Sequence, residues 1–473
     1  MAPVDPTLTA PAEPQHTPAP MSRAERRRAA RAASGPRALE WVSAEHIQSA
    51  SDGWPDSDTN AGTVAPLVSS WPRRTAWRPP LIISLATCAL LASTYTTAML
   101  VWPLDNVKPT VTATDIAPAV APASAMQWPE DGAAAVGVAG IDALASSSDE
   151  EYSMASITKV VTSLVMLEEL PLAVGEQGPT FGMSTGSYWQ YLGQDESALP
   201  VPDDGRLTEL QLLQGTLIGS AGNYIDRLVS ERYAADSIYA DVANEWLAAR
   251  NLPGITVIDP SGISSWNTAT PAALIPLAER AMAHPVFAEI VGMREVDLPG
   301  AGLVENTNAL LADEGVVGIK TGTLQDGYNV LAAKDVVVDG VTVRIYAVVL
   351  EQPDTDTRWA VGRSLFDQVE AQLQPITTVA AGTVVGEITT EWGESVNLLT
   401  TDDATLVMWN GSQGSAESSL ELGDTWTSGT DAGSVTATGP LGESTVGVRL
   451  DKTIDEPTPW WKLTHPLELT GIR

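Results

Sequence analysis

The chain has 473 residues, of which 44% are hydrophobic, and carries a formal net charge of −33 at pH 7. This length exceeds that of an ordinary single domain, so we expect two or more folded units with tails. The strongly acidic balance argues against a nucleic-acid partner, because it repels a phosphate backbone. The single cysteine, Cys88, excludes an intrachain disulfide and a cysteine-based metal site.

The first 80 residues differ in composition from the rest. They are rich in proline, alanine and serine, with few large apolar residues, which is typical of a disordered tail. They are also nearly neutral, with nine Lys/Arg against eight Asp/Glu, so the acidic excess lies in the remainder of the chain.

Residues 81–102 form an apolar run without a charged residue. As a helix of about 33 Å it is long enough to cross the hydrocarbon core of a membrane. Arg73, Arg74 and Arg78 precede this run, so the positive-inside rule places residues 1–80 in the cytoplasm and the later residues outside the cell. A cleaved signal peptide is the alternative, but its basic head is usually short. We therefore predict an uncleaved, single-pass membrane anchor.

The segments after the anchor indicate two folded domains. Residues 103–125 are rich in Pro, Thr, Ala and Val and predict an extended linker. Residues 126–375 predict an α+β domain, because helical runs separate an early strand from a late hairpin. The runs behind this prediction are a strand at 132–140, helices at 158–170, 207–218, 272–284 and 358–373, and strands at 328–338 and 341–350 joined by an Asp-Gly turn. Residues 376–473 contain short Val/Thr/Leu runs broken by glycine, which predict a β-sandwich-like domain.

Ser156 and Lys159 begin the helical run at 158–170 and form the first chemical motif, Ser-Ile-Thr-Lys. Residues three apart on a helix share a face, so the two side chains are expected to meet. The helix N-terminus favours a developing oxyanion near Ser156. A serine hydroxyl needs a base to become a nucleophile. The chain has only four histidines, none well placed, so Lys159 is the candidate base if burial or a second ammonium lowers its pKa.

Lys320, Thr321, Gly322 and Thr323 form the second motif, after a strand-like approach. Glycine permits close approach of a substrate backbone, and a strand edge pairs with an extended peptide. The ammonium and the two hydroxyl groups suit a substrate that ends in a carboxylate. The combination therefore predicts a site for such a substrate.

With these motifs the chain resembles the low-molecular-mass penicillin-binding proteins, the serine D-alanyl-D-alanine carboxypeptidases, over residues 126–473. The strings that carry the resemblance are ASITKVVTSLV (155–165), LIGSAGNY (217–224), DPSG (259–262), HPVF (284–287), NTNALL (306–311), GIKTGT (318–323) and, as in actinobacterial-type members, PWWKLTHP (459–466). The resemblance implies a serine β-lactamase/transpeptidase-like domain, no metal and no organic cofactor.

By this resemblance Ser156 is the nucleophile, Lys159 its base, and Ser220 the serine of the S-x-N motif that relays a proton to the leaving D-alanine. Lys320 would bind the substrate carboxylate and lower the pKa of Lys159. The backbone N–H groups of Ser156 and Thr323 would form the oxyanion hole. The sequence departs from the family at Gly222, where the motif has asparagine. A second possible alignment places Ala221 at the motif serine and Asn223 at the motif asparagine.

We therefore expect an anchored, extracellular carboxypeptidase that trims the terminal D-alanine from peptidoglycan stem peptides and is acylated by β-lactams. One alternative is a non-catalytic peptidoglycan-binding protein on the same fold, because Gly222 removes an amide from the site. A β-lactamase is the other alternative, although we find no convincing glutamate motif for a deacylating water between Ser220 and Lys320. The sequence does not distinguish carboxypeptidase from endopeptidase or transpeptidase chemistry.

Overall fold

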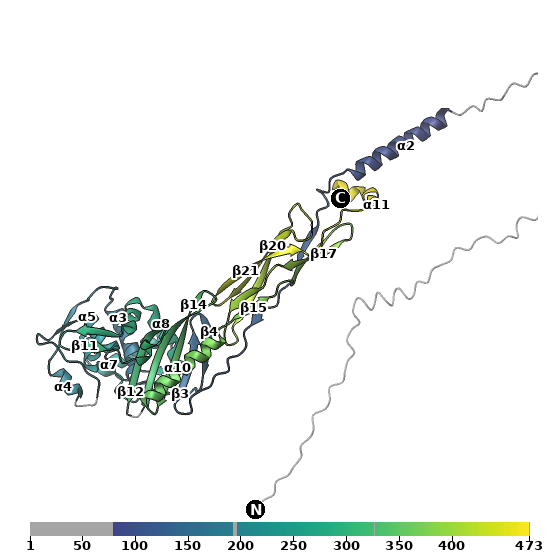
Figure 1. Ribbon diagram of the computed structural model, residues 1–473. Helices are drawn as coiled ribbons and strands as arrows, with labels where there is room; N and C mark the ends of the chain where they lie inside the picture. The colour runs from purple at the N-terminus through teal and green to yellow at the C-terminus, as the bar shows by residue number, and fades with distance from the viewer. Residues whose placement is uncertain (1–78, 193–195, 326, 473) are drawn as a thin grey trace, which may run out of the picture. The chain divides into compact units, whose positions relative to one another are not determined.

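The computed structural model describes residues 79–192, 196–325 and 327–472 (Figure 1). The predicted tail, residues 1–80, lies outside this range except for its last two residues, so its disorder stays a prediction. Pro80–Arg473 form one compact unit.

The first described element is the helix α2, Pro79–Leu100, which covers most of the apolar run at 81–102. Among the described residues it is the one helix that is long and apolar enough to cross a membrane, by length and composition. Its side chains from Ile82 onward are mostly exposed, with Leu85, Leu90 and Leu91 about two-thirds accessible. Such exposure is the opposite of what a core helix of a soluble domain shows.

A five-stranded antiparallel sheet forms the centre of the α+β region, in the order β12-β13-β14-β3-β4. Its strands are β3 Ala133–Val138, β4 Ile141–Ser146, β12 Val316–Leu324, β13 Gly327–Val338 and β14 Val341–Gln352. The predicted hairpin is confirmed as β13 and β14, which pair from Tyr328–Gln352 to Val338–Val341. β12 lies at the edge of this sheet, which leaves one side of the strand free for a further strand.

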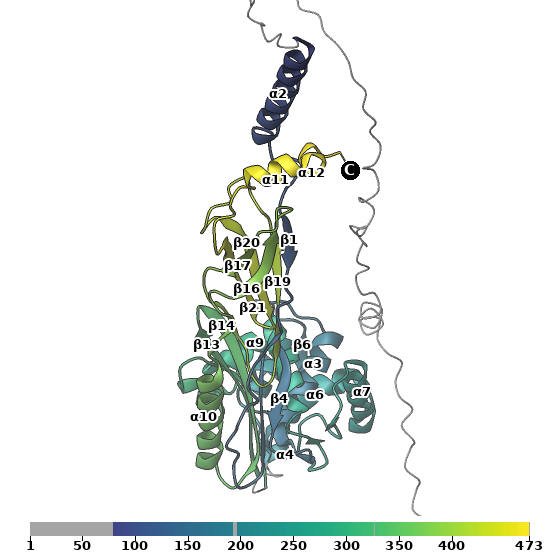
Figure 2. The same cartoon turned by 90° about the vertical axis from the view of Figure 1, so that its right-hand side faces the viewer.

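Both faces of this sheet are covered by helices (Figure 2). Successive residues of a strand point to opposite faces, and β13 shows this directly: Val330 and Ala332 belong to one core, Leu331 and Ala333 to the other. The first core is closed by α10, Thr355–Gln372. The second is closed by α3 Thr158–Glu169, α5 Glu209–Leu217, α6 Gly222–Arg232, α7 Asp236–Ala249, α8 Leu274–Ala283 and α9 Pro285–Gly292. The predicted α+β class is thereby confirmed.

The β-rich region has a seven-stranded sheet with a two-stranded sheet, β15–β18, packed in the same core. The seven strands, in spatial order, are β1 Thr110–Ala113, β16 Val384–Thr389, β17 Ser395–Thr400, β21 Gly442–Leu450, β20 Asp431–Gly439, β19 Gln413–Leu420 and β2 Ala119–Val120. The smaller sheet is β15 Pro375–Val379 with β18 Ala404–Val407.

The linker predicted at 103–125 differs from a free spacer in one respect. β1 pairs with β16 and β2 pairs with β19, so both linker strands sit on the edges of the β-rich sheet. Val111 and Ile116 pack against the core of this sheet, which gives the linker apolar contacts that its proline-rich composition does not reveal. We propose the same five segments, with the addition that the linker contributes two strands.

The remaining elements are short. They are β5 Tyr152–Ser153, η1 Ala155–Ile157, β6 Thr180–Gly182, α4 Ser187–Leu192, β7 Arg206–Thr208, β8 Ile255–Thr256, β9 Thr268–Ala269, β10 Glu295–Leu298, β11 Gly302–Glu305, η2 Ala309–Ala312, α11 Pro459–Thr464 and α12 Pro466–Thr470.

Candidate active site

Ser156 lies in the short 3-10 turn η1, which leads directly into α3. Ala155, just before it, has a φ of 49°, an unfavourable backbone conformation for alanine that the surroundings must hold in place. Thr158 Oγ1 helps to hold it by donating a hydrogen bond to Ala155 O at 2.8 Å. One turn further on, Lys159 Nζ donates to Ser156 Oγ at 2.9 Å, so the expected meeting of the two motif side chains is observed.

Lys159 is buried, with 1% of its surface exposed, and its ammonium has a second fixed partner. Nζ also donates to Ser261 O at 2.5 Å. The loop that carries this carbonyl is held by Asp259, whose carboxylate accepts bonds from the backbone N–H groups of Ser261, Gly262, Ile263 and Ser264 and from the side chain of Asn267. Lys159 Nζ is thus fixed between Ser156 Oγ and a rigid carbonyl.

Burial lowers the pKa of Lys159, which moves this residue toward the neutral form that a base needs. The charges that act most strongly on it are three carboxylates, Glu196, Asp226 and Asp259, and they oppose this shift by stabilising the ammonium. The resemblance implied that Lys320 would lower the pKa of Lys159. Burial is the largest cause of the lowering at Lys159, and the repulsion between Lys159 and Lys320 disfavours the ammonium form of both residues.

The second motif lies on β12 and faces the turn at Ser156. Gly322 packs so closely that an added Cβ would lie 2.7 Å from Met154 O and 3.2 Å from Ser156 N. Lys320 is fully buried, and its Nζ donates to Thr321 O at 3.1 Å. Burial, assisted by the charges of Lys159 and Arg358, holds the pKa of Lys320 well below its usual value. The Thr321 hydroxyl bonds to that of Thr307 at 2.6 Å.

Arg358 of α10 supports β12 from the opposite face of the sheet. Its Nη1 atom lies 3.3 Å from Thr323 Oγ1, 3.3 Å from Asn329 O and 3.5 Å from Gly322 O. Burial lowers the pKa of Arg358 to about 10, so the guanidinium stays charged at neutral pH. Arg358 thus supplies positive charge beside Thr323, which suits a carboxylate ligand.

The residues of the altered motif occupy different places. Ser220 is buried, has a φ of 59°, and its hydroxyl makes no hydrogen bond with any described residue. Asn223 uses its amide for the backbone of Leu199, accepting from Leu199 N at 3.1 Å and donating to Leu199 O at 2.9 Å. Its amide is therefore committed within the protein, which favours Ser220 rather than Ala221 as the motif serine.

A hollow of about 450 Å³ opens at Ser156. Its lining includes Ser156, Glu196, Ser261, Thr323 and Gln325. Among the described residues, no group of three or more His, Cys, Asp or Glu side chains is arranged to hold a metal ion.

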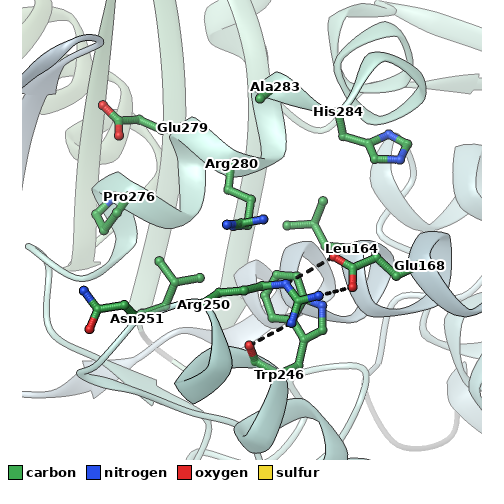
Figure 3. Close-up of a pocket in the computed structure, with 11 residues that line it drawn as sticks. Leu164, Glu168, Trp246, Arg250, Asn251, Pro276, Glu279, Arg280, Ala283 and His284 are labelled. Carbon is green, nitrogen blue, oxygen red and sulfur yellow. Dashed lines mark hydrogen bonds and ion pairs between the residues drawn. The ribbon is translucent and has the colours of Figure 1, made fainter.

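A second hollow, of about 580 Å³, lies away from the motif residues, between α3, α7 and α8 (Figure 3). Arg250 crosses it, with its guanidinium 4.3 Å from the Trp246 ring and bonded to the Glu168 carboxylate. None of the motif residues lines this hollow, so we place the candidate site at Ser156.

Sequence reasoning missed three residues of the site: Glu196, Ser261 and Arg358. Ser261 lies in the string DPSG, which carried part of the resemblance but was given no role. Glu196 and Arg358 belong to no motif. They reach the site through tertiary contacts, so no local sequence signal could have identified them.

Comparison with solved structures identifies the fold. The chain is similar to penicillin binding protein 5 from Haemophilus influenzae, with a TM-score of 0.50 and 18% identity over 71% of this chain and 100% of that one. It is also similar to a peptidoglycan synthesis regulatory factor (PBP3) from Streptococcus pneumoniae, with a TM-score of 0.48 and 20% identity over 68% and 99% of the two chains. The D-alanyl-D-alanine carboxypeptidase DacD from Francisella tularensis gives 0.47 and 15% over 73% and 97%.

No protein-family model matches the sequence, and a comparison with curated proteins found no match. The similarity to solved structures nevertheless defines the class: the chain has the fold of the penicillin-binding proteins, as the motifs predicted. The particular activity has to be argued from the site.

Proposed function

We propose that this chain is a membrane-anchored serine peptidase that removes the terminal D-alanine from peptidoglycan stem peptides through an acyl-enzyme. The observation that carries the proposal is the 2.9 Å contact between Lys159 Nζ and Ser156 Oγ, with Lys159 buried. A buried lysine beside a serine is a base for that serine, because burial favours the neutral amine.

In the proposed reaction, neutral Lys159 takes the proton of Ser156 as Oγ attacks the carbonyl of the penultimate D-alanine. The backbone N–H groups of Ser156 and Thr323 stabilise the oxyanion of the tetrahedral intermediate. The C–N bond then breaks, the leaving amine receives a proton through Ser220, and the acyl group remains on Ser156. Water hydrolyses this ester, returning the hydroxyl to Ser156 and releasing the shortened peptide.

The proposed substrate specificity rests on the charge beside β12. Arg358 supplies positive charge, and the amine of Lys320 and the hydroxyl groups of Thr321 and Thr323 supply hydrogen-bond donors for a terminal carboxylate. The edge position of β12 allows an extended peptide to add as a strand next to Gly322. The same groups would bind the carboxylate of a β-lactam, which would acylate Ser156.

The proposed location is the outer face of the cell membrane. α2 would be the single-pass anchor, with the peptidase and β-rich regions outside, because the arginines lie on its N-terminal side. A site that acts on the cell wall needs this orientation.

Intact-mass spectrometry of the full chain in detergent, with and without benzylpenicillin, tests the proposal. We expect one adduct per chain, absent in Ser156→Ala, and release of D-alanine from a peptide ending in D-alanyl-D-alanine but not from one ending in L-alanine. A folded chain that forms no adduct would instead be a peptidoglycan-binding protein. An adduct that decays within seconds to hydrolysed penicillin would indicate a β-lactamase.

A further inference from the structure

The glycine at position 222 leaves a space that a different residue fills. A Cβ atom added to Gly222 would collide with Oε1 of Glu196 and would lie 2.6 Å from its Cδ and 3.2 Å from its Cγ. Real Cβ atoms do not approach other atoms this closely, so the Glu196 side chain occupies the start of the path that a side chain at 222 would take. The carboxylate and the absent side chain thus compete for one position.

Three successive residues of α6 hold the segment that carries Glu196. Gly222 N donates to Ser197 O at 2.8 Å, the Asn223 amide binds both backbone groups of Leu199, and Tyr224 OH donates to Pro200 O at 2.6 Å. Glu196 N donates in turn to Tyr191 O at 3.2 Å. The position of the carboxylate is therefore built into the fold rather than left to a free side chain.

Glu196 lines the same hollow as Ser156, and its charge acts on Lys159 more strongly than that of any other residue. Its Oε1 atom is inaccessible to solvent and has no hydrogen-bond partner among the described residues. Burial raises the pKa of Glu196, and the charge of Lys159 opposes this more strongly than any other group does. The other titratable groups around this pair are Lys320 of β12, Tyr191 of α4, Asp226 of α6, Asp236 of α7 and Asp259.

We propose that Glu196 replaces the side chain missing at position 222 and acts as a positioning residue for Lys159. From the place beside Gly222, its charge acts on Lys159 through space and sets the pH range in which Lys159 takes the serine proton. The asparagine amide that the motif has at position 222 would lie near the ammonium of Lys159 without carrying a charge. The charged partner favours the ammonium form, so this chain acts at a higher pH than it would with an amide. The inference deepens the proposed function and rests on it for its catalytic meaning.

Lysine titration tests the inference without any catalytic readout. The chain has six lysines, so NMR of full-length protein in detergent, labelled with ¹³C at the lysine ε carbon, gives six signals. Lys159→Arg identifies the signal of Lys159. In Glu196→Gln we expect Lys159 to titrate about one pH unit lower, because a nearby opposite charge shifts a pKa by roughly that amount or more. Glu231→Gln is the matched control, since Glu231 pairs with Arg227 on the surface of α6.

An unchanged titration of Lys159 in a folded Glu196→Gln chain would overturn the inference. If the wild-type chain is acylated by penicillin, the rising limb of the acylation rate against pH should move down by the same amount in Glu196→Gln. A chain that is not acylated at all defeats the proposed function, yet the lysine titration still decides the role of Glu196.

An exchange of the two side chains tests the shared position. Gly222→Asn alone is expected to lower Tm by several degrees, because the new side chain displaces the Glu196 carboxylate. In a Glu196→Ala background the same substitution should cost much less, and Lys159 should titrate as in Glu196→Gln. Equal losses of Tm in the two backgrounds would show that the side chains do not compete.

Discussion

The candidate site has two walls that differ in how they are built. The motif wall, Ser156–Lys159 and Lys320–Thr323, joins the start of α3 to β12. The replaced wall, Glu196–Leu199 and Ser220–Asn223, joins an irregular segment to the start of α6. On the motif wall the recognisable residues themselves make the contacts, as in the 2.9 Å bond between Lys159 and Ser156.

On the replaced wall, Gly222 and Asn223 do not make the contacts that the motif predicts. Asn223 binds the backbone of Leu199 instead of facing the substrate, and Gly222 leaves its place to Glu196. A motif can therefore lose one of its side chains while a residue from another segment, here Glu196, fills the space that this side chain would occupy. A departure from a motif is therefore weak evidence for lost function until the neighbouring segments are known.

The largest expected effect comes from the centre of the motif wall. Lys159→Met removes the base while keeping similar length, so acylation of Ser156 by penicillin should fall about 10²–10⁴-fold. Tm should fall as well, because the substitution leaves the Ser261 carbonyl and the nearby carboxylates without the ammonium that they stabilise. Stopped-flow acylation rates and Tm measure both. Lys334→Met, which breaks an ion pair with Glu370, is the control and should be acylated at the wild-type rate. If Lys159→Met is acylated within threefold of the wild-type rate, Lys159 is not the base.

The next effect concerns the contact between β12 and the serine turn. Gly322→Ala places a Cβ 2.7 Å from Met154 O, so the strand and the turn must separate by a few tenths of an ångström. Misplacement of reacting groups by about 1 Å costs about 10²-fold, so we expect a loss of roughly 10–100-fold in the acylation rate. Gly423→Ala is the control, because an added Cβ there meets no atom within 4 Å. Equal rates in the two variants would contradict the close approach.

A smaller effect separates the two possible roles of Asn223 on the replaced wall. Asn223→Ala removes both bonds to Leu199, which should cost about 1–3 kcal/mol of unfolding free energy and several degrees of Tm. Asn223→Asp keeps the acceptor for Leu199 N but loses the donor to Leu199 O, so its Tm should lie between the Tm of wild type and that of Asn223→Ala. Thermal unfolding and peptidase kinetics check this. A raised KM with unchanged Tm would instead assign Asn223 to substrate binding.

The last effect is a pH dependence of stability at Asp226, behind the replaced wall. Burial raises the pKa of Asp226 to about 7, above its unfolded value near 4, although Tyr191 donates a hydrogen bond to it. Between pH 4 and pH 7 the folded state then binds more protons than the unfolded state. The stabilisation that Asp226 contributes to the folded state is therefore present below about pH 4 and is lost as pH rises through about 7. Asp226→Asn should raise the free energy of unfolding at pH 8, by at most about 4 kcal/mol since one pKa unit corresponds to about 1.4 kcal/mol, and should change it little at pH 4. Urea unfolding at both pH values measures this, and equal differences at the two pH values would refute it.

Much of the fold could be predicted from local patterns. The apolar run at 81–102, the helical run after Ser156 and the hairpin around Asp339-Gly340 each depend on neighbouring residues, and each appears in the structure. The β-rich region after residue 376 was predicted from short runs of the same kind. The two strands at 110–113 and 119–120 were not, because they pair with strands more than a hundred residues away.

By itself, the sequence determined that Ser156 and Lys159 meet, because three residues along a helix bring two side chains to one face. It also showed a glycine at position 222, where one of the two possible alignments of the motif expects an amide. Only the tertiary structure decided what surrounds these residues: the Ser261 carbonyl on Lys159, Arg358 behind β12 and Glu196 in the space beside Gly222. These contacts join segments far apart in the chain, and the packing of helices on the sheet, rather than any local pattern, brings them together.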